Sequence, residues 1–118
     1  MSTRFVFSKS FVYAWKGLMA VWKEEINFRI ETLVAFFVLL FAWYFDFSFA
    51  ENVAVLVAIF LVLSGEIINT AIEDLCNKIE PNTDMAIAKI KDVMAGFVLL
   101  SSLGASILGV FVLVNHFL

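Results

Sequence analysis

The sequence predicts an all-α membrane protein, with three transmembrane helices and an amphipathic surface helix at its N-terminus. Of the 118 residues, 63% are hydrophobic and 14 are phenylalanine, which is more apolar surface than a soluble domain of this length can bury. The apolar residues gather in three blocks, and the chain has no internal repeat or low-complexity segment. We therefore expect one domain over residues 1–118.

The N-terminal segment, about residues 5–23, has the pattern of a helix that lies on a membrane surface. At about 100° per residue, large apolar side chains share one face of this helix: Phe7, Phe11, Trp15, Leu18 and Trp22. Three lysines spaced by seven lie on the opposite face: Lys9, Lys16 and Lys23. This arrangement suits a helix half sunk among anionic headgroups. The alternative is a packed helix of a soluble domain. Because charged residues break the apolar run, we expect no cleaved signal peptide.

Three further segments are apolar and long enough to cross a bilayer, at about residues 30–47, 52–79 and 84–116. Trp43 and Tyr44, near the end of the first of these, are typical of an aromatic belt at a membrane interface. A helix over 52–79 would be roughly 42 Å long, more than the hydrocarbon core of about 30 Å. Its last turns must therefore emerge into water.

Pro81 marks the clearest break between helices, and it predicts that the last span begins at a cap formed by Asn82, Thr83 or Asp84. The link between the first two spans is short, so those two helices should run antiparallel. Cys76 is the lone cysteine, so no disulfide can form within the chain.

The basic residues predict the orientation in the membrane. All eight lie near the N-terminus or around the link between the last two spans: Arg4, Lys9, Lys16, Lys23, Arg29, Lys78, Lys89 and Lys91. Since cytoplasmic loops carry an excess of Lys and Arg, both regions are predicted to be cytoplasmic. The C-terminal His116 should then face the other side.

A polar stripe on the segment over 52–79 is the candidate active site. Glu66, Asn69 and Glu73, at positions i, i+3 and i+7, share one face of an otherwise apolar helix. Glu66 and Glu73 lie roughly 10 Å apart along the axis, so one carboxylate can serve an acceptor alcohol and the other a cation. Glu66 is the deeper of the two, where a base has to reach a lipid hydroxyl below the headgroups.

The predicted cytoplasmic rim adds further charged groups to this stripe: Glu24, Glu25, Glu31, Asp74, Asp84, Lys91 and Asp92. Carboxylates together with a lysine suit ATP and Mg²⁺, because proteins commonly hold this ion through one or two carboxylates and the phosphates. Neither a Gly-x-x-x-x-Gly-Lys loop nor a glycine-rich kinase loop occurs in the sequence. Any nucleotide site here therefore has another design.

Four motifs together are specific to one family: Ser10–Leu18, Glu25–Arg29, Glu66–Glu73, and Lys91–Asp92 followed by Ala95–Gly96. On these motifs nearly the whole chain resembles the small integral-membrane prokaryotic diacylglycerol kinases, a family that includes the undecaprenol kinases. The resemblance implies a homotrimer in the bacterial cell membrane, with composite active sites between protomers. It also implies that ATP enters from the cytoplasm and a lipid alcohol from the bilayer, and no nucleic-acid partner is expected.

The same resemblance implies roles for individual residues. Glu66 matches the general base of the family, and Asn69 matches a catalytic asparagine that can orient either neighbouring carboxylate. Glu25 and Glu73 match the carboxylates that hold Mg²⁺. Residues that contact ATP are implied at three positions: Tyr13, Lys91 and Asp92. Residues that contact the lipid substrate are implied at four: Lys9, Ala14, Trp15 and Glu66.

Several alternatives stay open at this point. Glu66 could be a structural carboxylate paired between protomers, and Glu25 and Glu73 could be rim charges that meet water. Glu24 could replace Glu25 as a metal ligand. Diacylglycerol is favoured as the acceptor by the family name, with undecaprenol close behind. A different class of function, a small proton-coupled exporter that uses Glu66, would need neither Glu25 nor Glu73.

Overall fold

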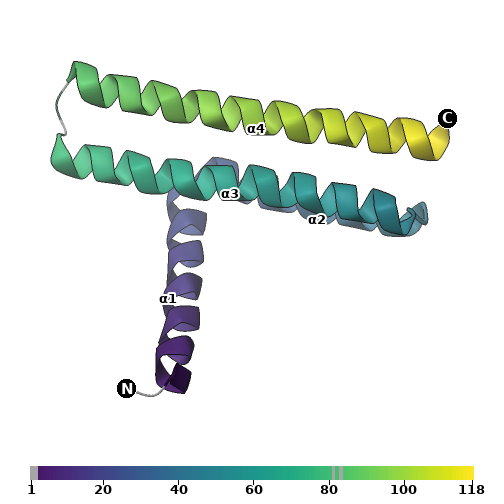
Figure 1. Ribbon diagram of the computed structural model, residues 1–118, viewed down its shortest axis with the longest axis horizontal. Coiled ribbons are helices and arrows are strands. Elements are labelled where there is room, and N and C mark those ends of the chain that lie inside the picture. Colours follow the sequence, from purple (N-terminus) through teal and green to yellow (C-terminus); the bar gives the residue numbers. More distant parts are fainter. Residues whose placement is uncertain (1–2, 81, 83) are drawn as a thin grey trace.

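The described residues form four helices joined by short turns. A computed structural model (Figure 1) describes residues 3–80, 82 and 84–118, with side chains from residue 7 onward. Its helices are α1 (Thr3–Glu24), α2 (Ile26–Tyr44), α3 (Phe49–Ile79) and α4 (Met85–Phe117). Three of them, α2 to α4, are long and apolar enough to cross a membrane. The predicted all-helical class with three spans is therefore confirmed.

The three long helices form one elongated bundle, and α1 stands across it (Figure 1). Helix α3 packs closely along α4 and more sparsely against α2. At 1.5 Å per residue, the 19 residues of α2 extend about 28 Å, close to the thickness of a hydrocarbon core. The 31 residues of α3 and 33 of α4 extend about 46 Å and 50 Å, so both helices project beyond α2 at the end where α1 joins.

The turn between α2 and α3 lies three residues earlier than the sequence pattern indicates, since α2 ends at Tyr44 and α3 begins at Phe49 rather than near residues 47 and 52. Asp46 has φ 55°, which a right-handed helix cannot accommodate. Ser48 then caps α3: its hydroxyl accepts from the Glu51 N–H at 3.2 Å, and the Glu51 carboxylate accepts from the Ser48 N–H at 2.8 Å. This reciprocal capping box sets the start of α3.

The turn between α3 and α4 ends at a second cap. The Asp84 carboxylate accepts from the backbone N–H groups of Ala86 at 2.9 Å and Ile87 at 3.1 Å. Asp84 is thus the cap among the three candidates, and two positions of interest, Pro81 and Thr83, lie outside the described residues. The cap directs α4 back along α3, antiparallel to it (Figure 1).

Few residues of the three spans are buried within a single chain. Within the most apolar stretch of each span, 11% of the residues of α2, 22% of α3 and 11% of α4 are buried. A small core of Ala42, Phe47, Val55 and Val112 closes the end of the bundle near the α2–α3 turn. Many of the other large apolar side chains of α2, α3 and α4 are exposed, so lipid or further protein must cover them.

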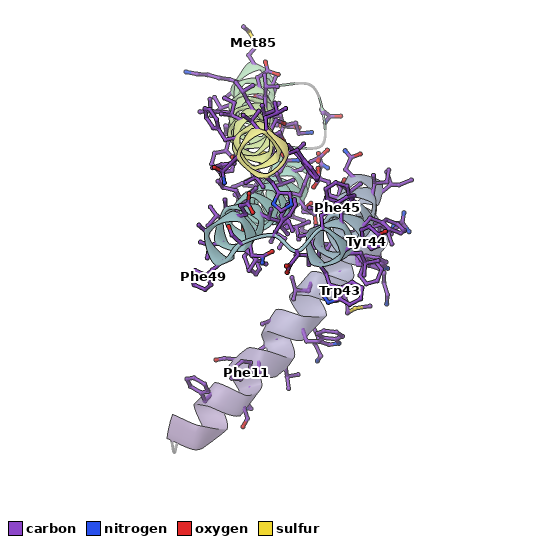
Figure 2. The ribbon with its side chains drawn as sticks, turned by 90° about the vertical axis from the view of Figure 1, so that its right-hand side faces the viewer. Phe11, Trp43, Tyr44, Phe45, Phe49 and Met85 are labelled. Carbon is purple, nitrogen blue, oxygen red and sulfur yellow. The ribbon has the colours of Figure 1, made fainter. Side chains whose placement is uncertain are left out.

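Aromatic side chains gather at the same end of the bundle. Figure 2 shows Trp43, Tyr44 and Phe45 together at the end of α2, with Phe11 on α1 away from the bundle. Trp43 and Tyr44 are 80% and 75% exposed, as expected of aromatic residues at a membrane interface. The position of α1 on a membrane surface stays a prediction, although its large apolar side chains from Phe7 to Leu18 are largely exposed.

Candidate active site

The carboxyl group of Glu66 lies inside the bundle, on α3. Only 5% of the residue is exposed, and the carboxyl group of Glu31 on α2 lies within hydrogen-bonding reach of it. Two carboxyl groups can share a hydrogen bond only if one of them carries a proton. One turn further along α3, the Thr70 hydroxyl donates to the backbone carbonyl oxygen of Glu66 at 2.8 Å. Thr70 therefore does not donate to the side-chain carboxylate of Glu66.

Two further carboxylates act electrostatically on Glu66. Glu25 is the residue between α1 and α2, and its extended backbone (φ −112°, ψ 110°) breaks the chain into two helices. Glu73 lies two turns beyond Glu66 on the same face of α3. Both repel the charge on Glu66. Acidic groups from α2, α3 and the α1–α2 junction are therefore close enough to Glu66 to act on its charge.

A cation would relieve this repulsion, and the arrangement fits one that is also held by phosphates. Within the described part of the chain, no three acidic, histidine or cysteine side chains converge closely enough to hold a metal ion alone. One or two carboxylates are what Mg²⁺ uses when a nucleotide supplies the other oxygens. In addition, Glu31 Oε2 is buried and has no hydrogen-bond partner among the described residues.

Beside this acidic cluster, α3 and α4 enclose a recess of about 200 Å³. Its polar lining comes from Asn69 and Glu73 on α3 and from Lys91 on α4. The Lys91 ammonium donates to the Asn77 carboxamide oxygen at 2.8 Å. Asp92, the neighbour of Lys91, is exposed on α4. Two of the predicted catalytic and metal-binding residues therefore share one recess with a predicted ATP-binding lysine.

The predicted residues on α1 lie in different surroundings. Tyr13 and Lys9 line a separate hollow of about 280 Å³ along α1, where the Lys16 ammonium lies 5.9 Å from the centre of the Tyr13 ring. Trp15 is 66% exposed. Ala14 lines a recess of about 420 Å³ between α1 and α3. A single chain therefore does not bring these side chains to the recess of Lys91.

That recess between α1 and α3 contains a second pair of acids, Glu24 on α1 and Asp74 on α3. A hydrogen bond between the two side chains, together with the negative charge of Asp74, raises the pKa of Glu24 above its ordinary value. The pair connects the last turn of α1 to α3. Glu24 and Asp74 are the sequence neighbours of Glu25 and Glu73, respectively.

Two residues of the site were given no role by the sequence analysis. Glu31 was counted among the charged groups of the cytoplasmic rim without a role of its own, yet it lies close to Glu66 and lines an apolar groove between α2, α3 and α4. A carboxylate inside an apolar segment is itself a signal of function. Asn77 is four residues beyond Glu73, so helical spacing placed it near the stripe, but its contact with Lys91 depends on how α4 packs.

Three helices long and apolar enough to cross a bilayer, with a buried carboxylate on α3, define an integral-membrane protein. A sequence profile of prokaryotic diacylglycerol kinase matches residues 12–113. The chain therefore belongs to the prokaryotic diacylglycerol kinase family, and it is a lipid kinase. This confirms the resemblance and favours the kinase over the exporter alternative.

Individual relatives agree with the family match. The diacylglycerol kinase of Escherichia coli (strain K12) is 30% identical over 105 residues, which cover 89% of this chain and 86% of the relative. The undecaprenol kinase of Bacillus subtilis (strain 168) is 29% identical over 106 residues, 90% of this chain and 86% of the relative. A diacylglycerol kinase of Synechocystis is 36% identical over 104 residues, 85% of this chain and 58% of the relative.

Proposed function

We propose that this lipid kinase transfers the γ-phosphoryl group of ATP to the hydroxyl group of a membrane lipid alcohol, with Mg²⁺ as the metal ion. Diacylglycerol is the first candidate acceptor and undecaprenol the second, because relatives of both names align over most of the chain. The observation that carries the proposal is Glu66, a buried carboxylate on the face of α3 that also carries Asn69 and Glu73, which line the recess with Lys91.

The acceptor lipid reaches Glu66 from the bilayer in this proposal. The groove between α2, α3 and α4 has a volume of about 440 Å³, and Glu31 is the charged residue in its otherwise largely apolar lining. Small side chains such as Ala58, Ala105 and Gly109 leave the groove open. A lipid alcohol whose hydrocarbon chain lies in this groove would place its hydroxyl group near Glu31 and therefore close to Glu66, the neighbour of Glu31.

Glu66 acts as the general base. It accepts the proton of the lipid hydroxyl as that oxygen bonds to the γ-phosphorus, and the bond from this phosphorus to the β–γ bridging oxygen breaks to release ADP. Asn69, one turn further along α3, orients the Glu66 carboxylate or the acceptor through its carboxamide. Positioning of the two reactants supplies much of the rate enhancement in phosphoryl transfer.

Glu25 and Glu73 would hold the metal ion together with the phosphates. When bound, Mg²⁺ neutralises charge on the β- and γ-phosphate oxygens. The repulsion that both carboxylates exert on Glu66 supports a cation at this place. Lys91 draws the phosphates from the other side of the recess, and Asp92 contributes a nucleotide contact next to it.

The residues on α1 complete the site in an assembly. Tyr13 and Lys9 line a hollow of their own on an exposed helix, so we assign them to an ATP-binding and a substrate-binding role, respectively, in a homotrimer with composite sites. Ala14 and Trp15 would contact the lipid. The lysine-rich end of the bundle would face the cytoplasm of a bacterial cell, in keeping with the distribution of basic residues.

The test is phosphate transfer in mixed micelles that contain either diacylglycerol or undecaprenol, with ATP and Mg²⁺. We expect transfer to at least one acceptor, and loss of that transfer in Glu66→Gln at unchanged helix content. No transfer to either lipid by the folded, metal-supplied protein would refute the proposal. If instead Glu25→Gln and Glu73→Gln left Mg²⁺-dependent nucleotide binding intact, the metal assignment would fail while the kinase assignment could stand.

A further inference from the structure

The contact between Lys91 and Asn77 joins the two longest helices at the edge of the recess. Asn77 lies on α3, one turn beyond Glu73, and Lys91 lies on the second turn of α4. The Lys91 Nζ atom donates to the Asn77 Oδ1 atom at 2.8 Å, which is an ordinary length for a charge-assisted hydrogen bond. Both residues are exposed, so a nucleotide can reach the ammonium group.

The ammonium group binds a neutral partner although a negative one lies nearby. Glu73 lines the same recess as Lys91, yet within the described part of the chain the two form no ion pair. A carboxamide oxygen holds an ammonium group without cancelling its charge. Lysine has three N–H donors, so two remain for phosphate oxygens after one is given to Asn77.

We propose that Asn77 is a positioning residue for the nucleotide: it holds the Lys91 ammonium at the edge of the recess and keeps it away from Glu73. The inference rests on the proposed function, since it takes Lys91 as a phosphate contact. Lysine has a long flexible side chain that loses conformational freedom when a ligand fixes it. A side chain already held by Asn77 loses less of that freedom when ATP binds. Glu73 stays free for the metal ion.

The experiment measures the rate of lipid phosphorylation against MgATP concentration, with the full-length protein in mixed micelles at saturating lipid. Asn77→Ala removes the acceptor, and we expect the KM for MgATP to rise by about fivefold to tenfold, the range of one modest hydrogen bond to a charged group. The kcat at saturating MgATP should stay within about twofold of the wild-type value. Asn77→Asp keeps an oxygen in the same place but adds a competing charge, so its KM should lie between those of the wild type and Asn77→Ala.

A double-mutant cycle with Lys91→Met separates this inference from the proposed function. Lys91→Met should raise the KM for MgATP, and adding Asn77→Ala to it should raise the KM no further. Lys89→Met is the matched control: it removes an exposed lysine two residues away on α4 and should leave the KM near the wild-type value.

The outcomes distinguish two failures. An unchanged KM in Lys91→Met would refute the phosphate contact of the proposed function. A raised KM in Lys91→Met with an unaltered KM in Asn77→Ala would overturn only the role of Asn77. An Asn77→Ala effect that persists at full size in the Lys91→Met background, or that lowers kcat with KM unchanged, would also overturn it, because Asn77 would then act by a route other than Lys91.

Discussion

Two glutamates near opposite ends of the bundle are equally buried, but one is surrounded by hydrogen-bond donors and the other by carboxyl groups. Glu51 and Glu66 are each 5% exposed. At the α2–α3 end, the Glu51 carboxylate accepts from the Ser48 N–H at 2.8 Å and from Asn115 Nδ2 at 3.1 Å, and it lies 3.0 Å from His116 Nδ1. These contacts join the start of α3 to the end of α4.

Glu66, near the other end, has other carboxyl groups as its neighbours. Glu31 lies within hydrogen-bonding reach, and Glu25 and Glu73 repel it. A buried charge with donors around it stabilises a fold, whereas a buried charge among like charges costs stability unless a ligand arrives. Burial alone therefore does not separate the structural carboxylate of Glu51 from Glu66, the proposed general base, but the partners of their oxygens differ.

Replacing Glu66, the proposed general base, should have the largest effect on catalysis. We expect Glu66→Gln to lower kcat by roughly 10² to 10⁴, the range for loss of a general base. The thermal midpoint should stay the same or rise, because the change removes a repelled charge. Phosphate transfer at saturating substrates and thermal melting followed by circular dichroism measure the two effects. More than a tenth of the wild-type kcat would contradict the base assignment.

The carboxylates assigned to the metal should show the next largest effect. In Glu25→Gln and Glu73→Gln, the Mg²⁺ concentration for half-maximal rate should rise by at least about 10-fold, since even indirect partners of metal ligands are worth 10- to 100-fold. Titration of Mg²⁺ at fixed ATP gives this value. Glu80→Gln, at the end of α3, is the control and should titrate like the wild type.

Glu31→Gln tests whether the neighbour of Glu66 takes part in the reaction. The amide keeps the shape of the side chain, but its NH₂ group would donate a hydrogen bond to the Glu66 carboxylate. This bond would compete with the lipid hydroxyl for the oxygen that accepts the proton. We expect kcat to fall by roughly 10-fold, the equivalent of one hydrogen bond to a charged group. A variant with wild-type kcat would limit Glu31 to packing in the apolar groove.

The structural glutamate should give the opposite pattern. Glu51→Ala removes the capping box and leaves Asn115 and His116 without their acceptor. The thermal midpoint should fall by roughly 5 °C, while kcat of the protein folded at low temperature stays within about twofold. Melting curves and rates from the same preparation settle the point. A lower kcat with an unchanged thermal midpoint would contradict the structural role of Glu51.

The smallest effect is expected at the acidic pair between α1 and α3. Because the pKa of Glu24 is raised by its hydrogen bond to Asp74, the shared proton stabilises this contact below the ordinary carboxyl pKa of 4.5, and the stabilisation is lost as pH rises above it. Hydrogen exchange in the last turn of α1 should therefore quicken with pH beyond the intrinsic rate. Glu24→Gln, which cannot ionise, should remove this excess dependence; an unchanged dependence would assign it to another group.

Much of the fold follows from local patterns in the sequence. Long apolar runs have few alternatives to membrane-spanning helices, so the three spans and their number could be predicted. The ends of α2 and α3 could not, because they depend on single backbone angles such as that of Asp46 and on the reciprocal cap of Ser48 and Glu51. Such caps shift a helix end by a few residues without changing the apolar pattern.

Only the part of the site that lies on a single helix could be predicted from residue spacing. Glu66, Asn69 and Glu73 share a face by helical geometry, and that part needs no tertiary information. The contact of Glu31 with Glu66 and that of Lys91 with Asn77 depend on how α2 and α4 pack against α3, which periodicity does not encode. Both contacts join residues more than ten positions apart in the chain.

The unequal lengths of the helices link catalysis to the host bilayer. Helix α2 is about as long as the hydrocarbon core is thick, whereas α3 and α4 exceed it by several turns. The level of Glu66 relative to the phospholipid glycerol groups then depends on acyl-chain length, because hydrophobic mismatch is met by tilt or local thinning. In the proposed reaction, membrane thickness would thereby set how readily the acceptor hydroxyl and ATP meet.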